Sequence, residues 1–308
     1  MEDLLVSVLI ITYNQEKYIK ETLDSVINQK HDYSYEIVIG EDCSTDGTKS
    51  IINDYVLKHP KIIKPIFNVN NLGLIRNYFN TLAHCTGKYV MVCGGDDCWC
   101  EGKVQQQITY FENHSDCDFL YGKVEGIDKD GSPRKINWGS EISNFEEIFK
   151  NIDKIPPVTI CFKRSIMEKY IFEIDPINRN WLMEDYPFYI WCVRNTNMKF
   201  QNEVYAKYRI LENSVSHSPQ INKKIRFYES IKDVREFYID YYHLSEEYSR
   251  YTNDFHNRSL FHFYINDLLY DKGIEFYKRI VNKSKKDKLI YILVKFRLYS
   301  FIRKIIKK

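Results

Sequence analysis

Two adjacent aspartates, Asp96 and Asp97, stand in the segment VMVCGGDDCWC, directly after an apolar run that is typical of a buried strand. No lysine adjoins them, and such a carboxylate pair suits a hard divalent cation with oxygen ligands and a bound phosphate. Cysteines at 93, 98 and 100 flank the pair, but a thiolate suits these cations poorly. The aspartates are therefore the predicted metal ligands.

Strand and helix patterns alternate around this pair. Apolar runs predict strands over residues 4–12, 35–42, 61–68 and 88–94, and amphipathic stretches between them predict helices, the first with Asn14 as its N-cap. This alternation predicts an α/β fold, most simply a doubly wound and mostly parallel sheet.

The polar residues that could bind a ligand follow the predicted strands. In such sheets ligands bind beyond the carboxyl ends of the strands, where helix N-termini and loop amides converge. No GxGxxG motif follows the first strand and no GxxxxGK[ST] motif occurs, which weighs against a dinucleotide or P-loop site. A nucleotide held by an acid on the second strand and by a metal on the fourth fits the residues at these ends: Thr12, Tyr13, Asn14, Glu41, Asp42, Asp96 and Asp97.

Length and composition set broader limits. The 308 residues suffice for one large domain or a core domain with a helical appendage, and a net charge of +2 predicts no general affinity for nucleic acid. We see no signal peptide and no apolar run of the roughly 18 residues that would span a bilayer, so we expect a cytoplasmic protein. The eight cysteines lack zinc-type spacing and are expected to be small buried side chains.

Six segments, in order, resemble the family 2 inverting glycosyltransferases of the GT-A fold. The resemblance spans roughly residues 4–215, and its GEDCSTDGT and GDDCW variants are similar to the branch that builds bacterial capsules, O-antigens and other surface glycans. The segments are VSVLIITYNQEKYIKETLDSVINQ, EIVIGEDCSTDGT, NLGLIRN, GKYVMVCGGDDCW, KVQQQITYFE and MEDYPFYIW.

This resemblance implies roles for individual residues. Asp42 corresponds to the acid that contacts uracil, and Arg76 to a basic residue near the uridine or diphosphate. Asp96 and Asp97 correspond to the DXD-type site, where Mn²⁺ or Mg²⁺ bridges the donor diphosphate; either could be the direct ligand. The remaining nucleotide-sugar contacts that it implies are Ile11, Thr12, Tyr13, Asn14 and Asn71.

The segment YRILENSVSHS resembles the loop that closes over the donor in this family. Tyr208, Arg209 and His217 are its candidate contacts, and His217 is a candidate third metal ligand.

Displacement at an anomeric carbon also needs a carboxylate to take the proton of the attacking hydroxyl. Glu184 and Asp185 precede an apolar, helix-like segment, whose N-terminal dipole favours ionised acids. By resemblance, Asp185 is the general base and Glu184 a supporting acid. The chain lacks the QxxRW signature of processive synthases, which favours transfer of one sugar at a time.

The C-terminal region is predicted to be helical. We expect a catalytic domain over residues 1–220 and a helical region over 221–308 that ends in a basic amphipathic tail. The tail could lie in a membrane interface or pack on protein. Its apolar stripe is Leu298, Phe301, Ile302, Ile305 and Ile306, and its basic residues are Lys295, Arg303, Lys304, Lys307 and Lys308.

The sequence therefore indicates an enzyme that moves a sugar from a UDP-sugar to a hydroxyl of a glycan or polyprenyl-linked acceptor. Two alternatives stay open. A sugar nucleotidyltransferase would be expected to carry a glycine-rich loop with arginine and lysine after the first strand, where this chain has TYNQEKY. A catalytically silent assembly subunit would be expected to lack Asp42, Asp96 or the Glu184–Asp185 pair, all of which are present.

Overall fold

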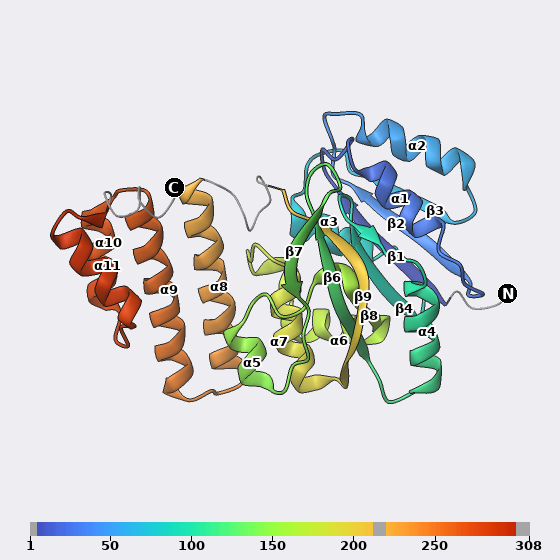
Figure 1. Cartoon of the computed structure of the whole chain (residues 1–308). Coiled ribbons are helices and arrows are strands. Elements are labelled where there is room, and N and C mark those ends of the chain that lie inside the picture. The colour runs from blue at the N-terminus through green and yellow to red at the C-terminus, as the bar shows by residue number, and fades with distance from the viewer. Residues whose placement is uncertain (1–4, 212–219, 300–308) are drawn as a thin grey trace. The chain divides into compact units, whose positions relative to one another are not determined.

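The computed structural model describes residues 5–211 and 220–299 (Figure 1). The chain divides into two compact units, Met1–Ile210 and Leu211–Lys308.

One mixed sheet forms the centre of the first unit. Its strand order is β3-β2-β1-β4-β8-β6-β9-β5, with β7 paired to β6. The strands are β1 Val6–Thr12, β2 Tyr35–Glu41, β3 Ile63–Phe67, β4 Tyr89–Gly94, β5 Cys98–Trp99, β6 Phe119–Ile127, β7 Pro133–Trp138, β8 Cys161–Lys163 and β9 Met198–Arg209.

The first four strands are parallel, which confirms the predicted α/β sheet. They are rich in valine and isoleucine because both faces of this half of the sheet are covered, and Val8, Ile10 and Ile39 are fully buried. Beyond β4 the sheet becomes mixed, since β8 is antiparallel to β4 and to β6, whereas β9 is parallel to β6.

Helices connect the strands and pack on the sheet (Figure 1). They are α1 Ile19–Ile27, α2 Thr48–Lys58, α3 Leu74–Leu82, α4 Lys103–Asn113, α5 Phe145–Lys150, α6 Arg164–Ile174 and α7 Asp185–Asn195, with short 3-10 turns at Pro157–Thr159 and Pro176–Asn178.

The predicted N-cap at Asn14 is wrong, because α1 begins at Ile19 with Tyr18 in the N-cap position. Asn14 instead has a left-handed backbone, with φ of +53°. Its side chain accepts a hydrogen bond from the Thr45 backbone N–H at 2.8 Å and so is committed to the neighbouring turn.

The second unit is helical, as predicted, with helices α8 Ile221–Tyr241, α9 Glu246–Asn266, α10 Tyr270–Arg279 and α11 Lys285–Lys295. Phe261, Ile265, Ile280 and Val294 form a buried cluster. Helix α11 ends before Leu298, so that residue does not share a helical stripe with α11. The remaining residues of the predicted tail stripe, from Phe301 to Ile306, lie outside the described residues.

Within the two described ranges, no helix combines the length and the apolar character needed to cross a membrane.

Candidate active site

The carboxyl ends of β1, β2 and β4 lie side by side. Thr12 pairs with Glu41 on β2, and Ile11 pairs with Gly94 on β4. The chain leaving β4 stays against β1, since the Gly95 N–H donates to the Ile11 carbonyl at 3.0 Å. The polar residues that follow these three strands therefore gather at one edge of the sheet.

Asp42 is buried at this edge and organises the loop that precedes α3. Its carboxylate accepts hydrogen bonds from the backbone N–H groups of Leu72 at 2.7 Å and Gly73 at 2.9 Å, and from the Asn68 amide at 3.0 Å. The Asn71 side chain donates to the Asp42 carbonyl at 3.1 Å. Asp42 and Asn71 are thus brought together, and Asp42 has a fixed orientation.

Two polar atoms after β1 are buried without a hydrogen-bond partner among the described residues. They are the Thr12 hydroxyl and the Gln15 amide oxygen. Both lie against Gly95: a Cβ there would come within 2.7 Å of Thr12 Oγ1 and 2.3 Å of Gln15 Oε1. Buried polar atoms normally have partners, so these two point to a ligand or ordered water beside Asp96.

Asp97 is buried and held in place by β9. Its Oδ1 atom accepts the Arg209 backbone N–H at 2.8 Å, and its carbonyl accepts the Thr22 hydroxyl at 2.8 Å. Burial and the charge of Asp96 raise the pKa of Asp97 well above its ordinary value. The Oδ1 atom of Asp97 is therefore already occupied by a hydrogen bond within the protein.

Asp96 is half-buried, so it is the more accessible member of the pair. Burial raises its pKa, while hydrogen bonding from the backbone and Gln15 and the charge of Arg209 oppose that rise. The Oδ1 atom of Asp96 and the Oδ2 atom of Asp97 both approach Gly94, within 3.1 Å and 3.0 Å of where a Cβ would lie. The absence of a side chain at Gly94 thus lets two carboxylate oxygens face the same space.

These two aspartates fit a hard divalent cation, because they bring oxygen ligands and negative charge, offset only in part by Arg209, into a partly buried site. Across residues 5–211 and 220–299, however, no cluster of three or more histidine, cysteine, aspartate or glutamate side chains could hold a metal. Two protein carboxylates with substrate phosphates are a common ligand set for Mg²⁺.

The sequence predicts Arg209 as a contact of the loop that closes over the donor, but in the structure its side chain holds the turn of the two aspartates. It is buried at the end of β9, donates from Nε to the Asp96 carbonyl and from Nη1 to the Asp128 carbonyl, and pairs with Glu21 at 2.5 Å. Its guanidinium also lies over the Tyr18 ring, 4.7 Å from the centroid. The geometry makes Arg209 a clasp for the turn that carries the two aspartates.

The loop expected over residues 208–218 begins later than predicted. Tyr208 and Arg209 belong to β9, where pairing with Gly126 and Ile127 extends the strand. His217 lies outside the described residues.

Glu184 and Asp185 form the second acid pair. Glu184 occupies the N-cap position of α7 and Asp185 is its first residue, as the sequence predicts. The Asp185 carboxylate accepts the Tyr186 N–H at 2.6 Å. Burial raises the pKa of both carboxyls, and the charge of Asp185 raises that of Glu184 further. Such a pair can change its protonation near neutral pH.

Two tyrosines that the sequence did not single out accompany this pair. Tyr78 on α3 and Tyr189, one turn after Asp185 on α7, are both buried. Burial and the charges of Glu184 and Asp185 raise the pKa of each well above its ordinary value, so both hydroxyls stay protonated. The Tyr189 hydroxyl has no hydrogen-bond partner among the described residues. Its i, i+4 spacing from Asp185 is the signal that could have identified it.

The other predicted side chains are more exposed. Tyr13 and Arg76 lie at the surface, Tyr13 after β1 and Arg76 on α3. The eight cysteines are free thiols, and burial raises the pKa of Cys93, which stands directly before Gly94, well above its ordinary value. The predicted packing role of the cysteines is confirmed for the six that are buried.

Comparison with known families decides what kind of protein carries this site. The family described as "Glycosyl transferase family 2" matches residues 7–173, which include β1 to β8 with both the Asp42 and the Asp96 regions. The chain belongs to glycosyltransferase family 2. The family resemblance seen in the sequence is thereby confirmed.

Curated relatives of this glycosyltransferase come from bacteria and archaea. An uncharacterized glycosyltransferase of Methanocaldococcus jannaschii is 32% identical over 217 residues, covering 68% of the chain and 72% of the relative. The putative teichuronic acid biosynthesis glycosyltransferase TuaG of Bacillus subtilis is 28% identical, covering 69% and 81%. An uncharacterized protein of Mycobacterium tuberculosis is 26% identical, and the aligned part of the chain spans only 64% of that protein.

Solved glycosyltransferase structures share the fold. S. aureus TarS 1–349, in complex with UDP-GlcNAc, superposes with a TM-score of 0.58 at 19% identity, covering 84% of this chain and 80% of that one. The mannosyltransferase PcManGT from Pyrobaculum calidifontis, in complex with GDP-Man and Mn²⁺, gives 0.58 at 15% identity, covering 97% and 82%. The predicted GT-A fold class is therefore confirmed.

Proposed function

We propose that this family 2 glycosyltransferase is an inverting, metal-dependent hexosyltransferase that moves one sugar from a UDP-sugar to an acceptor hydroxyl. Its catalytic domain comprises residues 1–220. The observation that carries the proposal is Asp96, a partly exposed carboxylate at the end of β4 beside two unpartnered oxygens and a clasped second aspartate. This arrangement suits a nucleotide diphosphate better than a neutral ligand.

The nucleotide occupies the crevice formed by β1, β2 and β4 in this proposal. Asp42 faces the base, and the strand end at Ile11, Thr12 and Tyr13 contacts the nucleoside. The loop before α3 is tied to Asp42 through Leu72, Gly73 and Asn71, and Arg76 follows in the first turn of α3. Arg76 is exposed, as a side chain that pairs with an incoming diphosphate must be.

Asp96, together with the Oδ2 atom of Asp97, would hold Mn²⁺ or Mg²⁺. When bound, the ion offsets the negative charge that the diphosphate gains as its bond to the sugar breaks. Asp96 is the direct ligand in this proposal, because Asp97 already uses one carboxylate oxygen to hold Arg209. The structure of the mannosyltransferase PcManGT contains Mn²⁺ together with GDP-Man, which supports divalent metal use in this fold.

Asp185 is the proposed general base. It takes the proton of the acceptor hydroxyl as that oxygen attacks the anomeric carbon, and the opposite face of the sugar releases the diphosphate, which inverts the configuration. Glu184 keeps a proton more readily than Asp185, because burial and the negative charge of Asp185 both raise the pKa of Glu184. Glu184 would therefore contact the acceptor as a hydrogen-bond donor while Asp185 stays ionised.

The acceptor is proposed to be a glycan or a polyprenyl-linked sugar in the synthesis of a bacterial surface polysaccharide such as a capsule or O-antigen. The name of TuaG, a teichuronic acid biosynthesis enzyme, supports this setting. The nucleotidyltransferase alternative loses support, because family membership and the turn after β1 both favour sugar transfer.

Contact with the inner face of the cell membrane belongs to the same proposal. Leu289 and Ile292 on α11 and Phe296 directly after it are exposed, with Lys288 and Lys295 beside them. An apolar stripe with basic flanks suits an anionic lipid surface. Co-sedimentation with vesicles containing anionic lipid, but not with neutral vesicles, would support it.

The direct test is nucleotide release by the purified full chain in Mn²⁺, Mg²⁺ or EDTA. The donor panel is UDP-glucose, UDP-galactose, UDP-GlcNAc, UDP-GalNAc and GDP-mannose. Metal-dependent turnover of a UDP-sugar is the expected result, and the anomeric configuration of a transfer product, read by NMR, tests inversion. Turnover of GDP-mannose alone would overturn the UDP assignment, and absence of all turnover and donor binding would favour the silent-subunit alternative.

A further inference from the structure

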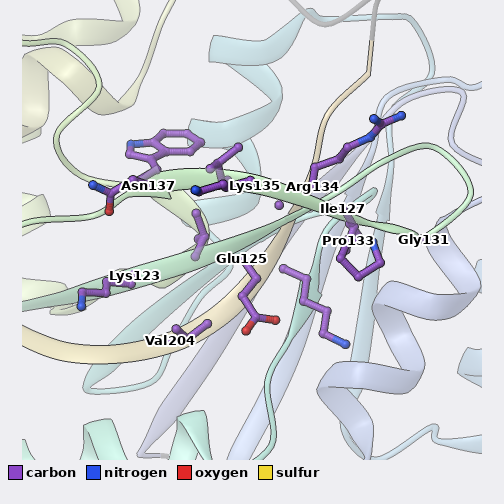
Figure 2. Close-up of a pocket in the computed structure, with 14 residues that line it drawn as sticks. Lys123, Glu125, Ile127, Gly131, Pro133, Arg134, Lys135, Asn137 and Val204 are labelled. Atoms are coloured by element: carbon purple, nitrogen blue, oxygen red, sulfur yellow. The ribbon is translucent and has the colours of Figure 1, made fainter.

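A groove of about 710 Å³ lies over the strands β6, β7 and β9, outside the crevice described above (Figure 2). Four basic side chains line it, with a single acidic one. The basic residues are Lys123, Arg134, Lys135 and Lys207, and the acidic residue is Glu125. Figure 2 shows Lys123 and Asn137 toward one end of the groove, and Arg134 and Pro133 toward the other.

The groove keeps a net positive charge. Arg134 pairs with Asp128 at 3.2 Å. Lys123, Lys135 and Lys207 form no ion pair with any residue in the described part of the chain. Cations gathered in a groove raise the local potential and attract anionic ligands.

The groove also offers groups that suit a sugar. Trp138 lines it, and its indole N–H is buried without a hydrogen-bond partner among residues 5–211 and 220–299. Its neighbour Asn137 is exposed and carries both a donor and an acceptor. Trp138 packs against the core beside Tyr208, and its neighbour Asn137 points to the opposite face of β7. The exposed Asn137 amide is therefore the group that can hydrogen-bond to sugar hydroxyls.

Strand β9 joins this groove to the aspartate pair. In the sheet register, Lys207 lies opposite Glu125 on β6 and opposite Cys98 on β5. Cys98 directly follows Asp97 in the chain. Two residues further along β9, a distance of about 7 Å, Arg209 holds Asp97. A chain lying in the groove would therefore reach the vicinity of the donor site.

We propose that the β6–β7–β9 groove binds the acceptor, and that this acceptor is an anionic glycan. Its carboxylate or phosphate groups pair with Lys123, Lys135 and Lys207 while the Asn137 amide contacts its sugar units. This inference rests on the proposed function, since it names the acceptor class of the same enzyme.

The test measures binding of short oligomers to the full chain by calorimetry, without donor or metal. Hexagalacturonate carries carboxylates, a glycerol-phosphate hexamer carries phosphates, and maltohexaose is the neutral match. We expect one or both anionic oligomers to bind at least about tenfold more tightly than maltohexaose, and which of them binds identifies the charged group. Raising NaCl from 50 to 500 mM should weaken that binding at least about fivefold, because salt screens exposed charges.

Two matched triple variants locate the site. The first variant combines Lys123→Gln, Lys135→Gln and Lys207→Gln and should lower the affinity for the anionic oligomer about tenfold. All three lysines are changed together because each exposed ion pair contributes little by itself. Three exposed lysines away from the groove provide the control, and changing them should alter affinity less than twofold: Lys58→Gln, Lys61→Gln and Lys169→Gln. Thermal melting checks that both variants fold.

Three results would overturn the proposal: maltohexaose binding as tightly as the anionic oligomers, an equal loss in both triple variants, or a thymidine hexanucleotide binding as tightly as the glycan. Failure here is distinct from failure of the proposed function. A wild-type protein that binds UDP-sugar but no anionic oligomer contradicts only the groove, whereas groove binding without donor binding contradicts only the donor assignment.

Discussion

The two carboxylate pairs of the first unit lie in contrasting surroundings. The turn of Asp96 and Asp97 is clasped by Arg209, which contributes a positive charge and hydrogen bonds to both residues. Glu184 and Asp185 form no ion pair with any described residue, and buried tyrosines accompany them. The first pair keeps its shape because Arg209 holds its turn, whereas the second pair, half-buried and without an ion pair, changes its protonation easily. The contrast indicates a binding role for the first pair and a proton-transfer role for the second.

The largest expected effect concerns the second pair. Asp185→Asn removes the proposed base and should lower kcat for sugar transfer by roughly 10²- to 10⁴-fold, with little change in donor KM. Steady-state kinetics with the turned-over donor measure this. Asp271→Asn, at an exposed acid in the first turn of α10, should leave kcat within twofold. Equal losses in both variants would contradict the assignment of Asp185 as the general base.

The clasp of the first pair should matter mainly for stability. Arg209→Met leaves Glu21 and the Asp96 and Asp128 carbonyls without their side-chain partner and should lower the free energy of unfolding by about 3 kcal/mol. Urea denaturation measures this. Arg76→Met, at an exposed arginine on α3, should change it by less than about 0.5 kcal/mol. An unaltered stability in Arg209→Met would show that the aspartate turn does not depend on the clasp.

The pH dependence of sugar transfer should report the ionisation of Asp185 in the second pair. Only the ionised form of Asp185 can accept a proton, so kcat/KM should rise as pH rises through its pKa and then level off. Because burial raises the pKa of Asp185, this limb should lie above the ordinary aspartate value of about 4. A pH–rate profile measures it, and a limb at or below pH 4 would contradict the buried environment.

The smallest effect compares two tyrosines on α7. The Tyr186 hydroxyl donates to the Phe149 carbonyl at 2.6 Å, whereas the Tyr189 hydroxyl is buried without a partner among the described residues. Tyr186→Phe should therefore lower the free energy of unfolding by about 1 kcal/mol, and Tyr189→Phe should raise it by about 1 kcal/mol. Chemical denaturation compares them. Destabilisation in both would mean that the Tyr189 hydroxyl is paired in solution.

Local sequence patterns predicted the first half of the sheet and the start of α7. The Val- and Ile-rich runs of β1, β2 and β4 are strong signals because these strands are buried on both faces. The acid pair at Glu184 and Asp185 stands where α7 begins, as expected. These features depend on neighbours in sequence.

Features that depend on distant contacts were missed. Arg209 and Asp97 are more than a hundred positions apart in the chain, so no local sequence pattern predicts their contact. Asn14 has the residue type of an N-cap, but its side chain bonds to Thr45 in another turn. The antiparallel return of β8 and the pairing of β9 with β6 likewise follow from tertiary packing.

The most direct test of the central claim separates donor binding from transfer. Calorimetric titration of the turned-over UDP-sugar into the wild type, Asp96→Asn and Asp185→Asn, with Mn²⁺ or EDTA, measures binding alone. The account predicts that Mn²⁺ strengthens donor binding at least about tenfold in the wild type and in Asp185→Asn, and that Asp96→Asn loses this gain. The control variant Asp32→Asn, titrated in the same way, changes an exposed acid elsewhere and should keep the gain. Metal-dependent binding that survives in Asp96→Asn, or is lost in Asp185→Asn, would contradict the assignment of the two pairs.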